Sequence, residues 1–296
     1  MDTMKTPLTA CLLLAASLAA CAGDGPARSA AGGSAQPATV ETFDADQKAF
    51  MEQGLRQFSR GDPGWEATRA RWIAMGPRAS GFLVNAMFSA LLQAQAIGSP
   101  ELVQRARHEL VLIGAPSVDF MASVLTTGQV TTVYDREQDK DVPVMVDDDM
   151  RREAAEVLAL IGAPAADATA RAADRAETKS GRRFAIQALG NMGERGGPAA
   201  SSALVRWARD PDWVLRVAAV EALRSFGDDG TRRVLEAALR DGEDLVREKA
   251  AAALAGRRET ASLPALRQAL AEARAAGRLV ETRRLEKAVR YVETGR

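Results

Sequence analysis

The feature that most constrains the fold is a helical segment that recurs along the chain. One copy runs from Asp210 to Gly227 and reads DPDWVLRVAAVEALRSFG. Asp210 is expected to accept hydrogen bonds from free backbone N–H groups at a helix start, and Pro211 suits the first helical position. Gly227 is expected to close the helix in a left-handed conformation. The apolar residues that share one helical face are Leu215, Ala219, Ala222, Leu223 and Phe226.

Copies of this segment keep a common register. Each has a leucine and an alanine four residues before it, and all but the last have a glycine four residues after it, where Arg258 stands instead. The leucines are Leu110, Leu158, Leu189, Leu223 and Leu254, and the alanines are Ala106, Ala154, Ala185, Ala219 and Ala250. The glycines are Gly114, Gly162, Gly193 and Gly227, and Trp72 and Gly76 take the leucine and glycine places of an earlier copy. Such a register predicts stacked units, none of which buries its apolar face alone.

A second set of helical segments lies between these copies, as at residues 199–209, 231–240 and 263–273. Each follows a short Gly, Pro or Asp connection, which favours antiparallel helix pairs. We therefore predict an all-α fold, a right-handed α-solenoid of about seven helix pairs over residues 43–296. The first helices of the pairs are expected to start near Asp44, Pro77, Pro116, Pro164, Pro198, Gly230 and Ser262.

The recurring unit resembles HEAT-like repeats of the short class also found in phycobilisome lyases. The residues that carry the resemblance are Asp210, Val214, Arg216, Ala219, Leu223 and Gly227, and Asp241, Val246, Arg247, Ala250 and Leu254. The resemblance implies that a turn aspartate and a second-helix arginine form a ladder across neighbouring repeats. That role is carried over to Asp210, Arg216, Asp241 and Arg247, with Arg151 and Arg182 in the same place of earlier copies. It also implies that the second helices line the concave face.

An insertion interrupts the third pair, where successive glycines lie 48 residues apart. Two alternating runs flank a charged turn there: Val130, Thr132 and Tyr134, and then Val142, Val144 and Val146. This alternation predicts a β-hairpin insertion at residues 127–147. Tyr134 and Val144 are the residues through which it would contact a partner. The alternative is a surface insertion without a function.

The N-terminus has the features of an export signal. Lys5 precedes an apolar run that ends at Leu18-Ala19-Ala20-Cys21. This segment resembles the lipobox of bacterial lipoproteins, which implies cleavage before Cys21 and lipidation of its sulfur. Residues 1–20 are then a signal peptide, and residues 21–42 a lipidated cysteine with a disordered tether. Because Ala22 is not the aspartate associated with inner-membrane retention, the resemblance favours a periplasm-facing outer-membrane lipoprotein.

The repeat region offers little catalytic chemistry. The two cysteines are Cys11 and Cys21, so the repeats have no disulfide or thiolate nucleophile. His108 is the one histidine, and it is expected to be structural on a half-buried helix rather than a metal ligand. Asp147, Asp148 and Asp149 are better explained by a helix N-terminus than by a Ca²⁺ site. We predict no enzyme activity, no metal and no cofactor, and expect all four tryptophans to make core and repeat contacts.

The charged residues indicate where a partner would bind. Positions six and two before each reference leucine, and one after it, are expected to form a polar stripe on the second helices. They are Arg152, Glu156, Arg183, Gln187, Glu221, Arg224 and Glu248. Their interleaved signs favour a protein or peptide partner over nucleic acid. The function predicted is a non-catalytic, lipid-anchored envelope scaffold.

Two alternatives remain open. One is an accessory or lyase-like module that holds a small ligand, against which the lack of Cys and His in the repeats argues. The other is a structural envelope component that self-associates. Residues 22–149 carry 11 basic and 17 acidic residues, whereas residues 150–296 carry 27 and 21. Such oppositely charged halves would favour head-to-tail association.

Overall fold

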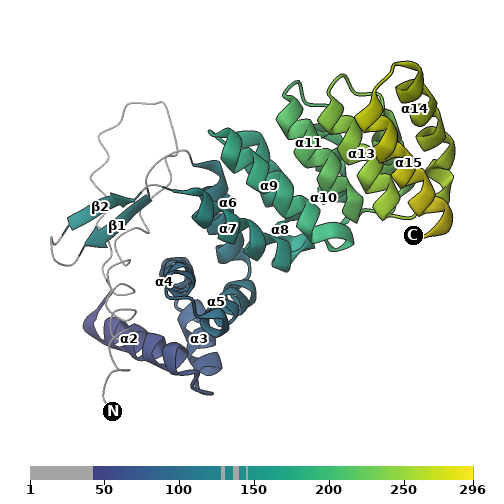
Figure 1. Ribbon diagram of the computed structural model, residues 1–296. Helices are drawn as coiled ribbons and strands as arrows, with labels where there is room; N and C mark the ends of the chain where they lie inside the picture. Colours follow the sequence, from purple (N-terminus) through teal and green to yellow (C-terminus); the bar gives the residue numbers. More distant parts are fainter. Residues whose placement is uncertain (1–42, 128–130, 136–139, 145, 296) are drawn as a thin grey trace, which may run out of the picture. The chain divides into compact units, whose positions relative to one another are not determined.

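The structure is a computed structural model that describes residues 43–127, 131–135, 140–144 and 146–295 (Figure 1). The described chain divides into two compact units. Unit 1 contains residues 43–117 together with 131–135 and 140–144, and unit 2 contains residues 118–127 and 146–295. The predicted signal peptide, Cys21 and the tether lie outside the described residues, so their assignments stay predictions.

Unit 1 is built on four helices and an aromatic core. The helices are α2 (Ala45–Arg60), α3 (Trp65–Ala74), α4 (Pro77–Ala96) and α5 (Pro100–Ile113). Asp44 caps α2 by accepting a hydrogen bond from the backbone N–H of Gln47 at 2.7 Å. Trp72 is fully buried, donates from Nε1 to the carbonyl of Ala79 at 2.9 Å and stacks on Phe82. The tryptophan in the leucine place therefore fills the core of this unit, as the register predicted.

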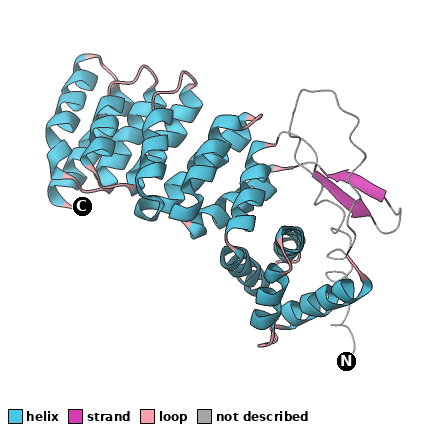
Figure 2. Cartoon of the chain, turned by 180° about the vertical axis from the view of Figure 1, so that it is seen from behind, coloured by secondary structure: helices cyan, strands magenta, loops and turns pink. Residues whose placement is uncertain are grey.

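Unit 2 is a stack of helices in which first and second helices alternate (Figures 1 and 2). The first helices are α6 (Ala115–Thr126, whose first three residues belong to unit 1), α8 (Ala163–Arg175), α10 (Gly197–Trp207), α12 (Asp229–Ala238) and α14 (Leu263–Ala275). The second helices are α7 (Asp148–Ile161), α9 (Lys179–Met192), α11 (Trp213–Ala222), α13 (Asp244–Gly256) and α15 (Leu279–Thr294). Short 3-10 helices are η2 (Gly193–Gly196), η3 (Leu223–Ser225) and η4 (Thr260–Ser262). All seven predicted first-helix starts are confirmed to within one residue.

The recurring leucine and alanine positions form the core. Leu110, Leu158, Leu189, Leu223 and Leu254, and the alanines four residues before them, are all fully buried. Small residues let the second helices approach closely: a Cβ added to Gly190 of α9 would lie 2.5 Å from the Cβ of Ala222 in α11. The second helices of unit 2 contact one another more extensively than the first helices do, which places them on the inner side of the stack.

The ends of the reference helix differ from the prediction. Asp212, not Asp210, is the N-cap of α11, and it accepts a hydrogen bond from the backbone N–H of Val214 at 3.0 Å. Asp210 instead accepts from the N–H of Asp212 at 2.8 Å and forms the turn before the helix. Gly227 is not left-handed, because α11 ends at Ala222 and continues as η3. The earlier glycines of the set do have positive φ angles: Gly76 106°, Gly114 77°, Gly162 76° and Gly193 55°.

The predicted fold class was wrong at the insertion. The described residues are helical apart from one short pair of strands, so the β-hairpin insertion predicted over residues 127–147 is not borne out in that extent. The described part of the insertion has only a short antiparallel pairing of β1 (Thr131–Asp135) with β2 (Lys140–Val144). Val146 was assigned to the hairpin face because it continues the valine alternation, but it is 5% exposed and buried in unit 2, next to the N-cap of α7. The side chains of Tyr134 and Val144 lie outside what the structure describes.

The described residues form two compact units, and the single repeat domain predicted over residues 43–296 stays a prediction. The regular stack belongs to unit 2, whereas unit 1 has its own aromatic core. Among the described helices, none is long and apolar enough to cross a membrane by itself; only α5 and α6 taken together, as a bent pair, reach that length and composition.

Candidate functional site

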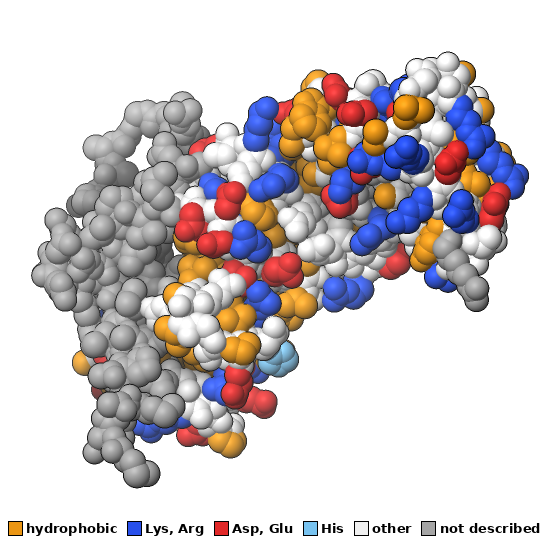
Figure 3. All heavy atoms as spheres, viewed as in Figure 1, with side chains coloured by type: hydrophobic (Ala, Val, Ile, Leu, Met, Phe, Trp, Pro, Cys, Tyr) orange, Lys and Arg blue, Asp and Glu red, His pale blue; other side chains and the backbone are white. Residues whose placement is uncertain are grey.

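A groove of about 600 Å³ runs across the second helices α9, α11 and α13 of unit 2. The space-filling view shows hydrophobic, basic and acidic side chains mixed over the unit (Figure 3). The groove is lined by Arg183, Gln187, Gly190, Asn191, Trp213, Val214, Val217, Ala218, Glu221, Ala222, Arg224, Ser225, Leu245 and Lys249. It is an open site with an apolar centre and charged sides.

Trp213 supplies the largest apolar surface in the groove. It is the first residue of α11 and is 43% exposed, whereas Trp65, Trp72 and Trp207 are buried. The prediction that all four tryptophans are core residues was therefore wrong for Trp213. Its position was visible in the sequence, since it directly follows the capping aspartate and lies ten residues before Leu223, off the buried face.

Half-buried aliphatic side chains extend this apolar centre. Val214 and Val217 come from α11, and Leu245 comes from the start of α13. Val217 occupies a position at which the other copies carry a polar residue of the predicted stripe. An exposed tryptophan beside aliphatic side chains is the kind of patch that a partner would cover.

The groove brings together four residues of the predicted polar stripe: Arg183, Gln187, Glu221 and Arg224. All four are exposed. Arg152 and Glu156 lie outside the groove lining on α7, where Arg152 pairs with Asp149 at 2.5 Å and Glu156 accepts a hydrogen bond from Asn191 at 3.4 Å. Glu248 lies on α13 and pairs with Arg284 of α15.

The charges in the groove are unequally paired. Glu221 is matched by Lys249 at 3.0 Å. Arg183 lies 3.7 Å from the carboxylate of Asp148, which also accepts a hydrogen bond from Ser180 at 2.5 Å. Arg224 has no carboxylate within ion-pair distance in the part of the chain that the structure describes. The groove therefore presents more unmatched positive than negative charge.

Four arginines link the helices of unit 2, and all four make the same kind of contact. Each donates to backbone carbonyl groups in the last turn of the first helix of its own pair or just after that helix. Arg151 donates to Thr127 at 3.2 Å, and Arg182 to Ala173 and Ala176 at 3.2 and 3.1 Å. Arg216 donates to Asp210 and Pro211 at 3.0 and 3.1 Å, and Arg247 to Asp241 and Gly242 at 2.8 and 3.1 Å. These bonds satisfy carbonyls that a helix end leaves without a partner.

Two of these arginines also reach the next pair. Arg216 binds Asp241 through two bonds of 2.8 Å, with both side chains less than one-fifth exposed. Arg247 binds Glu281 of α15 at 3.0 and 2.8 Å. Glu281 was not foreseen, because it lies inside the first turn of a helix rather than in a turn before one.

The two earlier arginines lack this carboxylate link to the next pair among the described residues. Arg182 lies 5.5 Å from the ring centre of Trp207, and Arg151 pairs with Asp148 of its own helix at 3.3 Å. The aspartate–arginine ladder implied by the resemblance is thus a set of contacts at Arg216, Asp241 and Arg247, and Asp210 contributes its backbone carbonyl.

Asp241 should make the free energy of unfolding of unit 2 depend on pH. Burial alone would raise the pKa of Asp241, but hydrogen bonds from Arg216 and the N–H of Glu243 lower it below the ordinary aspartate value. Since the folded pKa lies below the unfolded value of about 3.9, this contribution is present above that pH and lost as the pH falls through the folded pKa. We expect Asp241→Asn to lose less stability than the wild type between pH 7 and pH 3 in urea unfolding. Equal losses would contradict this assignment.

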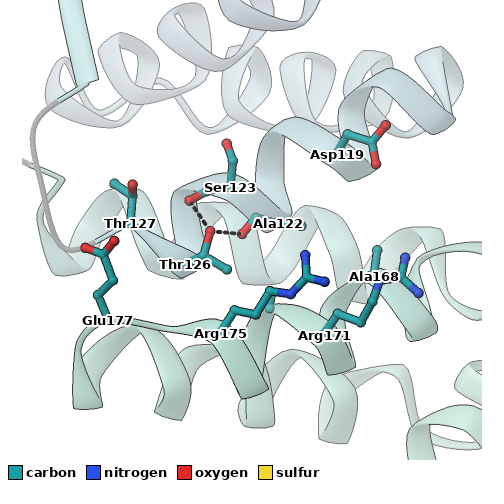
Figure 4. A pocket seen from close by; sticks show the side chains of 10 residues that line it. Asp119, Ala122, Ser123, Thr126, Thr127, Ala168, Arg171, Arg175 and Glu177 are labelled. Carbon is teal, nitrogen blue, oxygen red and sulfur yellow. Dashed lines mark hydrogen bonds between the residues drawn. The ribbon is translucent and has the colours of Figure 1, made fainter. Parts of the chain in front are cut away.

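A second hollow of about 500 Å³ lies between the first helices α6 and α8, within unit 2 (Figure 4). Arg171 and Arg175 extend along it from α8, opposite Ser123 and Thr126 of α6. The hydroxyl of Thr126 donates to the carbonyls of Ala122 and Ser123, at 3.2 and 2.9 Å. The lining also includes acidic Asp119 and Glu177, and it has no large apolar side chain. It is a weaker candidate than the groove because it lacks an apolar anchor.

His108 is exposed on α5, a helix whose other face is buried (Figure 3). Within the described ranges, no group of three or more His, Cys, Asp or Glu side chains could hold a metal ion.

The geometry of unit 2 defines a class of protein, the α-solenoids of stacked helix pairs. Comparison with protein families finds a similarity for the repeats: the family of HEAT repeats matches residues 146–224 and 201–281, so this part of the chain is similar to HEAT repeats. No curated protein matched the chain. One similar solved structure is that of an engineered protein from the Northeast Structural Genomics Consortium. It shares 14% identity over 83% of this chain and 74% of its own, with a TM-score of 0.39, which does not establish a common fold.

Proposed function

We propose that this protein is a non-catalytic HEAT-repeat scaffold whose second-helix groove binds a segment of a partner protein. The observation that carries the proposal is the exposed Trp213 in the lining of a groove that also has charged side chains. Aromatic side chains in a partly desolvated patch supply much of the energy of protein recognition, and surrounding charges select the partner. HEAT-repeat solenoids are commonly protein-interaction scaffolds, which supports the same conclusion.

We further propose that the scaffold is held at the bacterial outer membrane through lipidated Cys21. The support is the Leu18–Cys21 sequence after a short apolar run. Two or more acyl chains are needed for stable anchoring, because a single chain binds a membrane marginally. Fractionation of cells that express the wild type and Cys21→Ser tests this part separately. Equal amounts of both proteins in the membrane fraction would contradict it.

Site-specific photocrosslinking in cells tests the binding groove. A photoreactive amino acid is placed at Val217, inside the groove, and in a matched protein at Arg233, which lies in a hollow between the first helices α10 and α12. We expect a defined crosslinked protein from position 217 and none of that mass from position 233. The same crosslinked product from both positions would mean that the groove does not select the partner.

A small-ligand module is the second candidate, and the exposed Trp213 in a groove of about 600 Å³ is what favours it. Pockets for small ligands fall in the range of about 300 to 1,000 Å³. The mixed charge on the groove sides suits a polar protein segment better than an apolar ligand. A ligand that copurifies with the wild type and is lost in Trp213→Ala, without any crosslinked protein, would favour this second function.

A further inference from the structure

The last helix, α15, uses all of its acidic side chains to bind the helices on which it packs. The carboxylates of Glu281, Glu286 and Glu293 each bind an arginine of α13 or α14, at 2.8, 2.7 and 2.6 Å. Arg284 binds Glu248 of α13 in the same way. These ion pairs connect α15 to the rest of unit 2, which it closes at one end (Figure 1).

Three cations of α15 have no such partner. Arg283, Lys287 and Arg290 are exposed, and no carboxylate lies within ion-pair distance of them in the part of the chain that the structure describes. They follow one another after four and three residues, so at 3.6 residues per turn they share one face of the helix. That face lies opposite the buried side of α15, which consists of Leu285, Ala288, Val289 and Val292.

Two apolar side chains extend this face at the start of the helix. Leu279 and Val280 are 73% and 64% exposed, more than any other large hydrophobic residue that the structure describes. Leu279 lies four residues before Arg283, and Val280 lies seven before Lys287, so both are on the same side of α15. The resulting end face has three cations, two apolar side chains and no carboxylate, and it consists of Leu279, Val280, Arg283, Lys287 and Arg290.

The chemistry of the end face matches an anionic lipid surface. Each Lys or Arg near such a surface strengthens binding about fivefold. Aliphatic side chains beside the cations can enter the boundary between headgroups and acyl chains. A site for single-stranded nucleic acid would be expected to have aromatic side chains for stacking, and the end face has none. A protein interface usually has its apolar residues at the centre, whereas Leu279 and Val280 lie at one end.

We propose that the end face of α15 docks on the anionic headgroups of a phospholipid bilayer. The three cations contact the phosphates, and Leu279 and Val280 enter the layer below them. The inference goes beyond the proposed groove function, and it rests in part on the proposed anchor, because a chain attached through Cys21 meets the bilayer at a high effective concentration. None of the end-face residues lines the groove, so the two sites use different side chains.

Flotation with lipid vesicles tests the inference on the predicted mature chain, residues 21–296, with Cys21→Ser so that no lipid is attached. Vesicles of phosphatidylcholine alone are compared with vesicles of phosphatidylcholine and phosphatidylglycerol in equal amounts. At about 0.1 M salt the chain should float with the anionic vesicles and not with the neutral ones. It should be released at about 1 M salt, where the Debye length falls to about 3 Å.

A matched pair of triple variants assigns the binding to the end face. Arg283→Gln, Lys287→Gln and Arg290→Gln together should weaken binding about a hundredfold. The control removes three exposed cations of the first helices, through Arg171→Gln, Arg175→Gln and Arg233→Gln. It changes the net charge equally and should alter binding by less than about twofold, because charges beyond about 10 Å are screened at this salt concentration.

Leu279→Ala tests the apolar part of the end face. It should weaken vesicle binding about fivefold, because less apolar surface leaves water. Circular dichroism establishes that this variant and both triple variants are folded.

Four results would overturn the inference: equal flotation with neutral vesicles, no flotation with anionic vesicles, equal losses in the two triple variants, or full binding by Leu279→Ala. A photoreactive amino acid at position 283 that crosslinks to one protein in cells, without vesicle binding, would assign the end face to an acidic partner protein. If vesicle binding fails while membrane fractionation still depends on Cys21, the proposed anchor stands and only this inference is wrong.

Discussion

Replacing Leu223 by Ala is expected to lower the free energy of unfolding of unit 2 by about 3 kcal/mol, as for other buried Leu→Ala changes. Leu223 is fully buried in η3, and it occupies the same place as Leu158, Leu189 and Leu254 in neighbouring pairs. The change removes apolar contacts and leaves a cavity that the tightly packed second helices fill only partly. Urea unfolding followed by circular dichroism measures the loss.

Leu279→Ala is the matched control. The same side chain is removed, but Leu279 is 73% exposed at the start of α15. The free energy of unfolding should change by less than about 0.5 kcal/mol, as for other exposed positions. If the two variants were equally stable, the recurring leucine would not be the core position of the repeat.

Replacing Arg216 by Ala is expected to cost about 2 to 3 kcal/mol, because charged hydrogen bonds are lost and partly buried partners stay unpaired. The guanidinium donates to Asp241 through two bonds, and to the carbonyls of Asp210 and Pro211. The arginine and the aspartate are 17% and 15% exposed, so water replaces the lost bonds poorly.

Arg206→Ala provides the comparison. Arg206 also binds a carboxylate of the preceding pair, Asp174, with two contacts of 2.7 and 2.8 Å, but the side chains are 60% and 45% exposed. Exposed ion pairs of this kind contribute less than about 1 kcal/mol. A loss at Arg206 as large as that at Arg216 would show that burial does not set the strength of these links.

Much of the fold could be predicted from the sequence because each position of the repeat recurs in several copies, and each copy supports the same assignment. One leucine among apolar residues is ambiguous, but five leucines with an alanine at a fixed distance, four of them also with a glycine, determine the helix register. The first-helix starts followed from proline and glycine placed between these segments. The insertion occurs only once, and there the alternation of valines assigned Val146 to a strand although it is buried beside a helix start.

The candidate site was less predictable because its residues differ from copy to copy, so no second copy supports an assignment. Five of the seven polar stripe residues are exposed, Glu156 and Glu248 are half-buried, and a role for them in binding a partner stays a prediction. Trp213 was missed because composition favours burying a tryptophan, and only its place after the cap of α11 exposes it. The carbonyl contacts of the arginines and the link to Glu281 depend on how each side chain extends between helices, which spacing along the chain does not specify.

The arginine contacts affect how such a protein can gain or lose helix pairs in evolution. Arg182, Arg216 and Arg247 each donate to carbonyls of their own helix pair, so each of these three pairs contains its own link between its two helices. Duplication or loss of one whole pair would leave no helix end without its donor. Glu281 receives the last arginine, so α15 completes the series as an end piece. The stack of unit 2 can thus lengthen or shorten in evolution by whole helix pairs.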